Sequence, residues 1–104
     1  MANVYALALA DLPLGSIKEV ELEDETVLLL HLEKGIYAVN GICTHARVHL
    51  SGGHVENGAT LCCSQHGGKF DIATGKAVAL PVMTALATYP VTVQAGGIYV
   101  EIEA

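Results

Sequence analysis

The sequence predicts an all-β domain, and three observations carry this prediction. Apolar and polar residues alternate with a period of two in several runs, which places neighbouring side chains on opposite faces of a strand. Turn-forming residues separate these runs, as at Asp24-Glu25 and Glu33-Lys34-Gly35. No window combines helical spacing of apolar residues with capping residues. We therefore expect an antiparallel β-sandwich base that carries a small inserted lobe.

Four strands are expected in the first part of the chain. Val4–Ala10 is an apolar opening strand, and in Lys18–Glu23 three glutamates alternate with apolar residues. Thr26–Leu32 is a nearly continuous apolar run, which is typical of a strand covered on both faces. Ile36–Val39 follows a turn and completes this part of the base.

Two further strand-like runs, Ala87–Gln94 and Gly97–Glu103, lie near the end of the chain. Pro90 interrupts the first of them, and this predicts a sheet edge or a bulge. The stretch between the outer strands is rich in glycine and holds all three cysteines and four of the five histidines. We expect one domain, residues 1–104, with a base formed by 1–40 and 83–104 and a lobe formed by about 41–82.

Composition excludes several classes of protein. The chain has 104 residues, of which 52% are apolar and 15% charged, so it is not intrinsically disordered. Its 11 acidic and 5 basic residues give a net charge of -6, and a nucleic-acid partner would need a basic surface instead. No apolar run approaches the roughly 20 residues of a membrane span, so we expect no membrane partner.

The N-terminal apolar run also has some features of a secretory signal, because Ala8-Leu9-Ala10 is similar to a cleavage site. A signal requires a positive segment before the apolar run, whereas the first basic residue is Lys18. An odd number of cysteines cannot pair fully within the chain, which disfavours a secreted disulfide scaffold. We expect a cytoplasmic protein with reduced thiols.

Two short motifs carry the candidate chemistry. They are Cys43-Thr44-His45 and Cys63-Ser64-Gln65-His66, separated by the seventeen residues 46–62. Together they offer two thiolates and two imidazoles, a set that suits tetrahedral zinc or an iron–sulfur cluster. Zinc fingers usually pair cysteine with cysteine and histidine with histidine, whereas each motif here mixes the two. Mixed pairs suit a two-iron centre in which two histidines hold one iron and two cysteines hold the other.

The two motifs, with Gly67–Asp71 after the second, resemble the motif pair of Rieske 2Fe–2S proteins. The resemblance covers nearly the whole chain and is greatest to the small Rieske ferredoxins of bacterial aromatic-ring-hydroxylating dioxygenase systems. It implies that Cys43 and Cys63 bind the inner iron of one 2Fe–2S cluster. It also implies that His45 and His66 bind the outer iron. Pro81 falls where the family has a proline-containing loop over the cluster.

The resemblance implies a one-electron carrier with no substrate chemistry of its own. Such a carrier takes electrons from a flavin-dependent NAD(P)H reductase, the flavoprotein ferredoxin reductase, and passes them to a terminal Rieske non-haem iron oxygenase acting on aromatic compounds. Two alternatives stay open on the sequence alone. One is a structural zinc-binding interaction module, and the other is a Rieske subunit of another redox system.

Comparison with Rieske proteins of respiratory and photosynthetic complexes predicts a low potential. Those proteins have two further cysteines where this chain has Val48 and Gln65, and hydroxyl donors where it has Gly68 and Phe70. Donors directed at sulfur stabilise the reduced state, so their loss lowers the potential. We expect a value toward about −150 mV rather than about +300 mV.

The remaining candidate residues have simpler interpretations. We expect Cys62 to be a small buried side chain rather than a ligand, because neighbouring strand residues point to opposite faces. His49 and His54 are expected to be solvated loop histidines, and His31 a hydrogen-bonded strand histidine. The glutamates of 18–23 are expected to form a solvated strand face.

Overall fold

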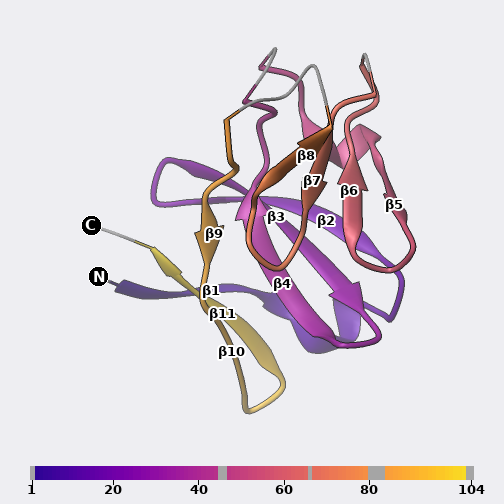
Figure 1. The fold of residues 1–104 in the computed structure, drawn as a ribbon. Helices are drawn as coiled ribbons and strands as arrows, with labels where there is room; N and C mark the ends of the chain where they lie inside the picture. The colour runs from indigo at the N-terminus through magenta and orange to yellow at the C-terminus, as the bar shows by residue number, and fades with distance from the viewer. Residues whose placement is uncertain (1, 45–46, 66, 80–83, 103–104) are drawn as a thin grey trace.

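The computed structural model describes residues 2–44, 47–65, 67–79 and 84–102, which form three antiparallel sheets (Figure 1). Apart from two 3-10 turns, η1 (Leu9–Asp11) and η2 (Leu50–Gly52), no helix occurs in these residues. The predicted all-β fold is therefore confirmed. Within the same ranges, no helix is long and apolar enough to cross a membrane.

The three sheets use strands from different parts of the chain. The first sheet has the order β1 (Ala2–Ala8), β11 (Gly97–Ile102), β10 (Val91–Gln94). The second has the order β2 (Ile17–Leu22), β3 (Glu25–Leu32), β4 (Gly35–Asn40), β9 (Thr88–Tyr89). The third has the order β5 (His54–Glu56), β6 (Thr60–Cys62), β7 (Lys69–Asp71), β8 (Ala77–Ala79). In Figure 1 the third sheet lies at the upper right and the first at the lower left.

Strand β3 contributes to two hydrophobic cores, which explains its continuous apolar sequence. Val27 and Leu29 pack in one core with the apolar face of β11, whereas Leu28 and Leu30 pack in the other with residues of β6 and β7. All four side chains are fully buried. Burial of a leucine of this kind stabilises the fold by about 1.5–3 kcal/mol. The expectation of a strand covered on both faces is confirmed.

The predicted run 87–94 is divided at Pro90 into two strands that belong to different sheets. Strand β9 pairs with β4, and β10 pairs with β11, so each lies at a sheet edge. Proline has no N–H for a ladder, although its carbonyl oxygen still accepts a hydrogen bond from the Glu101 N–H at 2.9 Å. The expected edge position of Pro90 is confirmed.

The third sheet comes from one continuous part of the chain, between β4 and β9. Its four strands all lie between residues 54 and 79, inside the range expected for the inserted lobe. The other two sheets combine strands from both ends of the chain. Cys43 and Cys63, next to strands of the lobe and the base, pack in the core that contains Leu28 and Leu30 of β3.

Candidate metal centre

The first cysteine motif lies on a loop that we call the first loop, residues 43–48. An antiparallel bridge between Ile42 and His49 joins the two ends of this loop. The Cys43 N–H donates a hydrogen bond to the Val48 carbonyl oxygen at 2.8 Å. The backbone therefore fixes the cysteine at the start of a closed hairpin loop.

The second motif lies on the second loop, residues 63–68, which connects β6 to β7. Cys62 and Lys69 pair across its base, and the Cys63 N–H donates to the Gly68 carbonyl oxygen at 2.7 Å. In both loops the cysteine thus bonds to a carbonyl five residues further along the chain. Two equivalent loops each place one cysteine at the same structural position.

The two cysteine side chains face the same core. Cys43 is 2% exposed and Cys63 is 3% exposed, and both pack in the core that contains Phe70. Neither forms a disulfide. Burial raises the pKa of Cys63, the backbone N–H of Gln65 acts in the opposite direction, and the neighbouring Cys43 thiol raises it further. Two sulfur donors from different loops are therefore adjacent and shielded from solvent.

The other two predicted ligands, His45 and His66, lie outside the described residues, as does Pro81. Directly before His45 in the sequence, the Thr44 hydroxyl donates a hydrogen bond to the Thr84 carbonyl oxygen at 2.7 Å. This bond connects the first loop to the segment that leads into β9. The structure thus brings together the two predicted cysteine ligands, and the histidine ligands stay a prediction.

Two glycines allow close backbone approaches that sequence patterning did not identify, one within the lobe and one between the lobe and the base. A Cβ atom on Gly53 would lie 2.1 Å from the carbonyl oxygen of Cys62, directly before the second loop. A Cβ atom on Gly75, whose φ is 78°, would lie 2.1 Å from the carbonyl oxygen of Leu86. The Leu86 N–H also donates to the Gly75 carbonyl oxygen at 2.7 Å. Only glycine allows these contacts. The high glycine content of the lobe was the only feature of the sequence that pointed to them.

A contact between a histidine and a carboxylate connects the lobe to the base. His49 Nδ1 lies 2.7 Å from Glu19 Oε1 on β2, although thirty residues separate the two positions. His49 was expected to be solvated, and its side chain is indeed 57% exposed. Its contact with Glu19 was not expected. The glutamate face of β2 therefore reaches the end of the first loop.

The remaining candidate residues agree in part with expectation. His31 Nδ1 lies 2.7 Å from the Leu12 carbonyl oxygen, so the prediction of a hydrogen-bonded strand histidine is confirmed. Cys62 is 2% exposed, as expected, but it packs in neither hydrophobic core. His54 is exposed as expected, yet it lies in β5 rather than in a loop, and its Nε2 lies 3.3 Å from Glu56 Oε2.

Comparison with known families decides what this arrangement is. The family described as Rieske [2Fe-2S] domain matches residues 2–90. The chain is a Rieske domain. Its cofactor is therefore one Rieske 2Fe–2S cluster, as the resemblance of the two motifs to the Rieske motif pair implied.

The Rieske domain is similar to named ferredoxins over almost its whole length. It is 34% identical over 102 residues to the 3-phenylpropionate/cinnamic acid dioxygenase ferredoxin subunit of Escherichia coli (strain K12), covering 98% of this chain and 95% of the relative. Among solved structures it matches the ferredoxin of carbazole 1,9a-dioxygenase from Nocardioides aromaticivorans IC177, with a TM-score of 0.91 and 26% identity, over 99% and 100% of the two chains. It also matches a chain in a complex of reduced oxygenase and oxidized ferredoxin in carbazole 1,9a-dioxygenase, with a TM-score of 0.87 and 27% identity, over 97% of each chain.

The described part of the site fits such a cluster chemically. Iron–sulfur clusters are bound by cysteine thiolates, and two unbridged cysteine sulfurs lie side by side on equivalent loops. The hydrogen bonds that close the loops are made by backbone atoms, so they leave the sulfur lone pairs free for a metal. Burial raises the pKa of Cys63 overall, and the Gln65 N–H directed at its sulfur offsets part of this rise by stabilising the thiolate, the form that binds iron.

Proposed function

We propose that this Rieske domain is the ferredoxin component of an aromatic-ring-hydroxylating dioxygenase system. It is a one-electron carrier and makes or breaks no substrate bonds. The observation that carries this proposal is its similarity to ferredoxin subunits over 98% of its own length and 95% of theirs. The complex of oxygenase and ferredoxin among its structural neighbours supports a terminal oxygenase as the electron acceptor. A flavoprotein ferredoxin reductase in the cytoplasm is the proposed donor.

We assign the cluster ligands to four residues, two on each loop. Cys43 and Cys63 bind one iron, and their burial beside Phe70 supports the assignment of this iron to the inner position. His45 and His66 bind the outer iron, since each lies in the same loop as one of the cysteines. When bound, a Rieske cluster accepts and releases a single electron.

The protein itself keeps the site rigid and selects partners by charge. Fixed loops limit rearrangement when the site changes charge. Here a backbone hydrogen bond closes each loop, and the close approach of Gly53 to Cys62 constrains the chain directly before the second loop. The net charge of -6 favours encounters with basic partner surfaces, and this attraction weakens as salt increases.

Adjacent cysteines offer a matched test of the ligand assignment. Purified protein should be red-brown, and Cys63→Ser should lose the visible Rieske absorption and most of its iron. Cys62→Ser, which makes the same exchange of sulfur for oxygen in the neighbouring residue, should keep both. A colourless wild-type protein that contains zinc would overturn the proposal, as would an unchanged spectrum in Cys63→Ser.

The carrier function has a separate test. Holoprotein reduced by one electron should be reoxidised rapidly by an aromatic-ring dioxygenase supplied with its substrate, and the rate should fall as ionic strength rises. Reduced holoprotein that does not support turnover by any such oxygenase would contradict the carrier proposal even if the cluster is present.

A further inference from the structure

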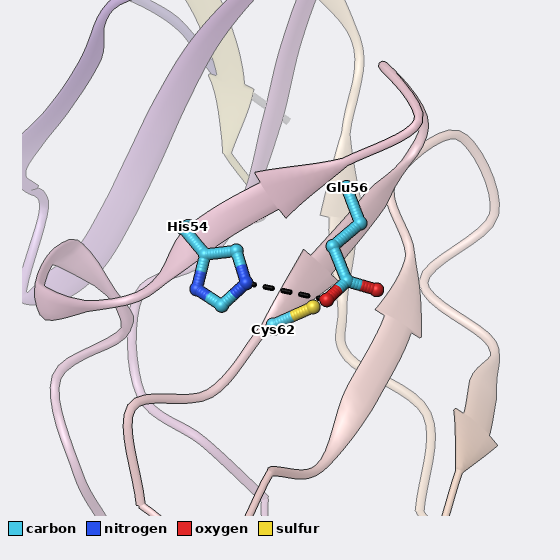
Figure 2. A group of neighbouring side chains, drawn as sticks. All are labelled: His54, Glu56 and Cys62. Atoms are coloured by element: carbon cyan, nitrogen blue, oxygen red, sulfur yellow. Dashed lines mark hydrogen bonds and ion pairs between the residues drawn. The ribbon is translucent and has the colours of Figure 1, made fainter.

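Three side chains with metal-binding atoms meet on the outward face of β5 and β6, apart from the two cluster loops. His54 and Cys62 lie directly opposite each other in the register of these strands, and Glu56 follows on the same face as His54. Their ligand atoms, one from each residue, all lie within 4.8 Å of one another. Figure 2 shows the imidazole and the thiol on the same side of the Glu56 carboxylate, next to the oxygen that His54 contacts.

The three groups form a partly enclosed site that is open on one side. The Cys62 side chain is buried at 2% exposure, although it belongs to neither hydrophobic core. The side chains above it remain accessible, since His54 is 65% exposed and Glu56 is 38% exposed. A solvated ion can therefore approach the thiol from the side on which the imidazole and the carboxylate stand.

Lys69 on β7 leaves this site available. Its Nζ lies 2.8 Å from Glu56 Oε1, whereas the other carboxylate oxygen, Oε2, faces His54 at 3.3 Å. An ion bound through Oε2 would thus keep the existing ion pair. The charge of a divalent ion would be balanced by the carboxylate and by a thiolate, with the thiol proton released to solvent.

We propose that His54, Glu56 and Cys62 form a second metal site, which binds a zinc-class divalent cation with water as the fourth ligand. Cysteine sulfur, histidine nitrogen and carboxylate oxygen are all zinc ligands, and three protein ligands with water as the fourth leave an open position. Zinc bonds of about 2.0–2.3 Å place ligand atoms roughly 3.3–3.8 Å apart in a tetrahedron. The imidazole and carboxylate atoms already meet this spacing, so small side-chain movements would complete the site.

The site is distinct from the proposed cluster because Cys62, the last residue of β6, and Cys63, the first residue of the second loop, have different surroundings. Cys63 points into the core with Cys43, whereas Cys62 points outward to His54 and Glu56. With Cys43 and Cys63 bound to iron, Cys62 is the remaining one of the three cysteines. A thiolate–metal signal in the holoprotein therefore reports on Cys62.

Cadmium and zinc titrations of the holoprotein test the proposal. Cd²⁺ should bind with one equivalent per chain and produce an ultraviolet thiolate-to-cadmium absorption band, while the iron content and the visible spectrum stay constant. Calorimetry should show that Zn²⁺ binds the same site, and added Zn²⁺ should displace the cadmium. Loss of one ligand should weaken binding about tenfold or more, since loss of a mere supporting contact weakens metal sites by about 10–100-fold.

Three variants separate this site from other surface ligands. His54→Ala should weaken Zn²⁺ binding, and Cys62→Ser should also remove the cadmium band. The matched control is His49→Ala. It also removes an exposed histidine that contacts a glutamate, but His49 is not grouped with a cysteine thiol. This control should bind both ions as the wild type does. Absence of stoichiometric binding, a missing thiolate band, or equal affinity in wild type and His54→Ala would overturn the proposal.

Discussion

Replacing Gly53 with alanine should push the second loop away from the turn η2, because the new methyl group has no space. Its Cβ would lie 2.1 Å from the Cys62 carbonyl oxygen, and the Leu50 carbonyl oxygen is 3.2 Å from the same point. Heavy atoms in ordinary contact stand about 3.5 Å apart, so the backbone must shift by roughly 1.4 Å. The peptide that must move directly precedes the proposed ligand Cys63.

The expected loss of stability follows from this overlap. Overpacking of this kind costs about 1–3 kcal/mol. For a domain of about this size, each kcal/mol lowers Tm by about 4–8 °C. We expect Gly53→Ala holoprotein to unfold at least several degrees below wild type and to lose iron at a lower temperature. Thermal unfolding followed by circular dichroism, together with the visible cluster absorption, measures both effects.

The neighbouring glycine provides the control. A Cβ on Gly52 would meet the Ser64 hydroxyl oxygen at 3.6 Å, which is an ordinary contact. Alanine at a compatible backbone position stabilises a protein by about 0.4–1 kcal/mol through the unfolded state. Gly52→Ala should therefore match or exceed wild-type stability. Equal unfolding temperatures for the Gly53 and Gly52 variants would refute the steric argument.

Three further predictions concern other parts of the lobe. Gly75→Ala should destabilise the holoprotein more than Gly58→Ala in thermal unfolding, because both glycines have positive φ but only Gly75 has a backbone atom within 3 Å of its Cβ position; equal losses would contradict this. Phe70→Tyr should raise the reduction potential by roughly 20–60 mV if its hydroxyl donates to ligand sulfur, because one hydrogen bond contributes about 0.5–1.5 kcal/mol and 59 mV corresponds to a tenfold change in the equilibrium constant of a one-electron couple. Voltammetry measures this shift, and a fall in potential would contradict the prediction. The pKa of Glu56 is lowered from 4.5 to about 2, and the hydrogen bond from Lys69 is the largest cause. The Lys69–Glu56 pair therefore stabilises the fold fully above about pH 4.5, and this stabilisation is lost as pH falls toward 2. Lys69→Met should therefore show a smaller loss of Tm than wild type over this acid range, and identical pH profiles would count against the pair.

The local sequence pattern predicted most of the strands because each strand's environment is written in its own residues. Thr26–Leu32 has no polar face, and the structure covers both faces of β3. Pro90 predicted an edge because a residue without an N–H is excluded from a central strand. The local pattern could not predict that the chain passes from one sheet to another at Pro90, because strand partners depend on residues far along the sequence.

The candidate site shows the same limit. The spacing of Cys43 and Cys63 with their histidines indicated a paired ligand set, and the structure brings these two cysteines together. Contacts between distant segments were not predictable from local patterns. The His49–Glu19 pair joins residues thirty positions apart, and the approach of Gly53 to the second loop depends on how the lobe folds. The burial of Cys62 was expected, but its polar neighbours emerged only from the register of β5 and β6.

The central claim is that two histidines and two cysteines of this chain bind one 2Fe–2S cluster. The most direct measurement is the nitrogen hyperfine coupling in the electron paramagnetic resonance of reduced protein labelled with ¹⁵N-histidine. The assignment of His45 and His66 predicts two strongly coupled histidine nitrogens, with the coupled signal lost in His66→Ala. A reduced cluster without histidine coupling, or a spectrum unchanged by that substitution, would contradict it.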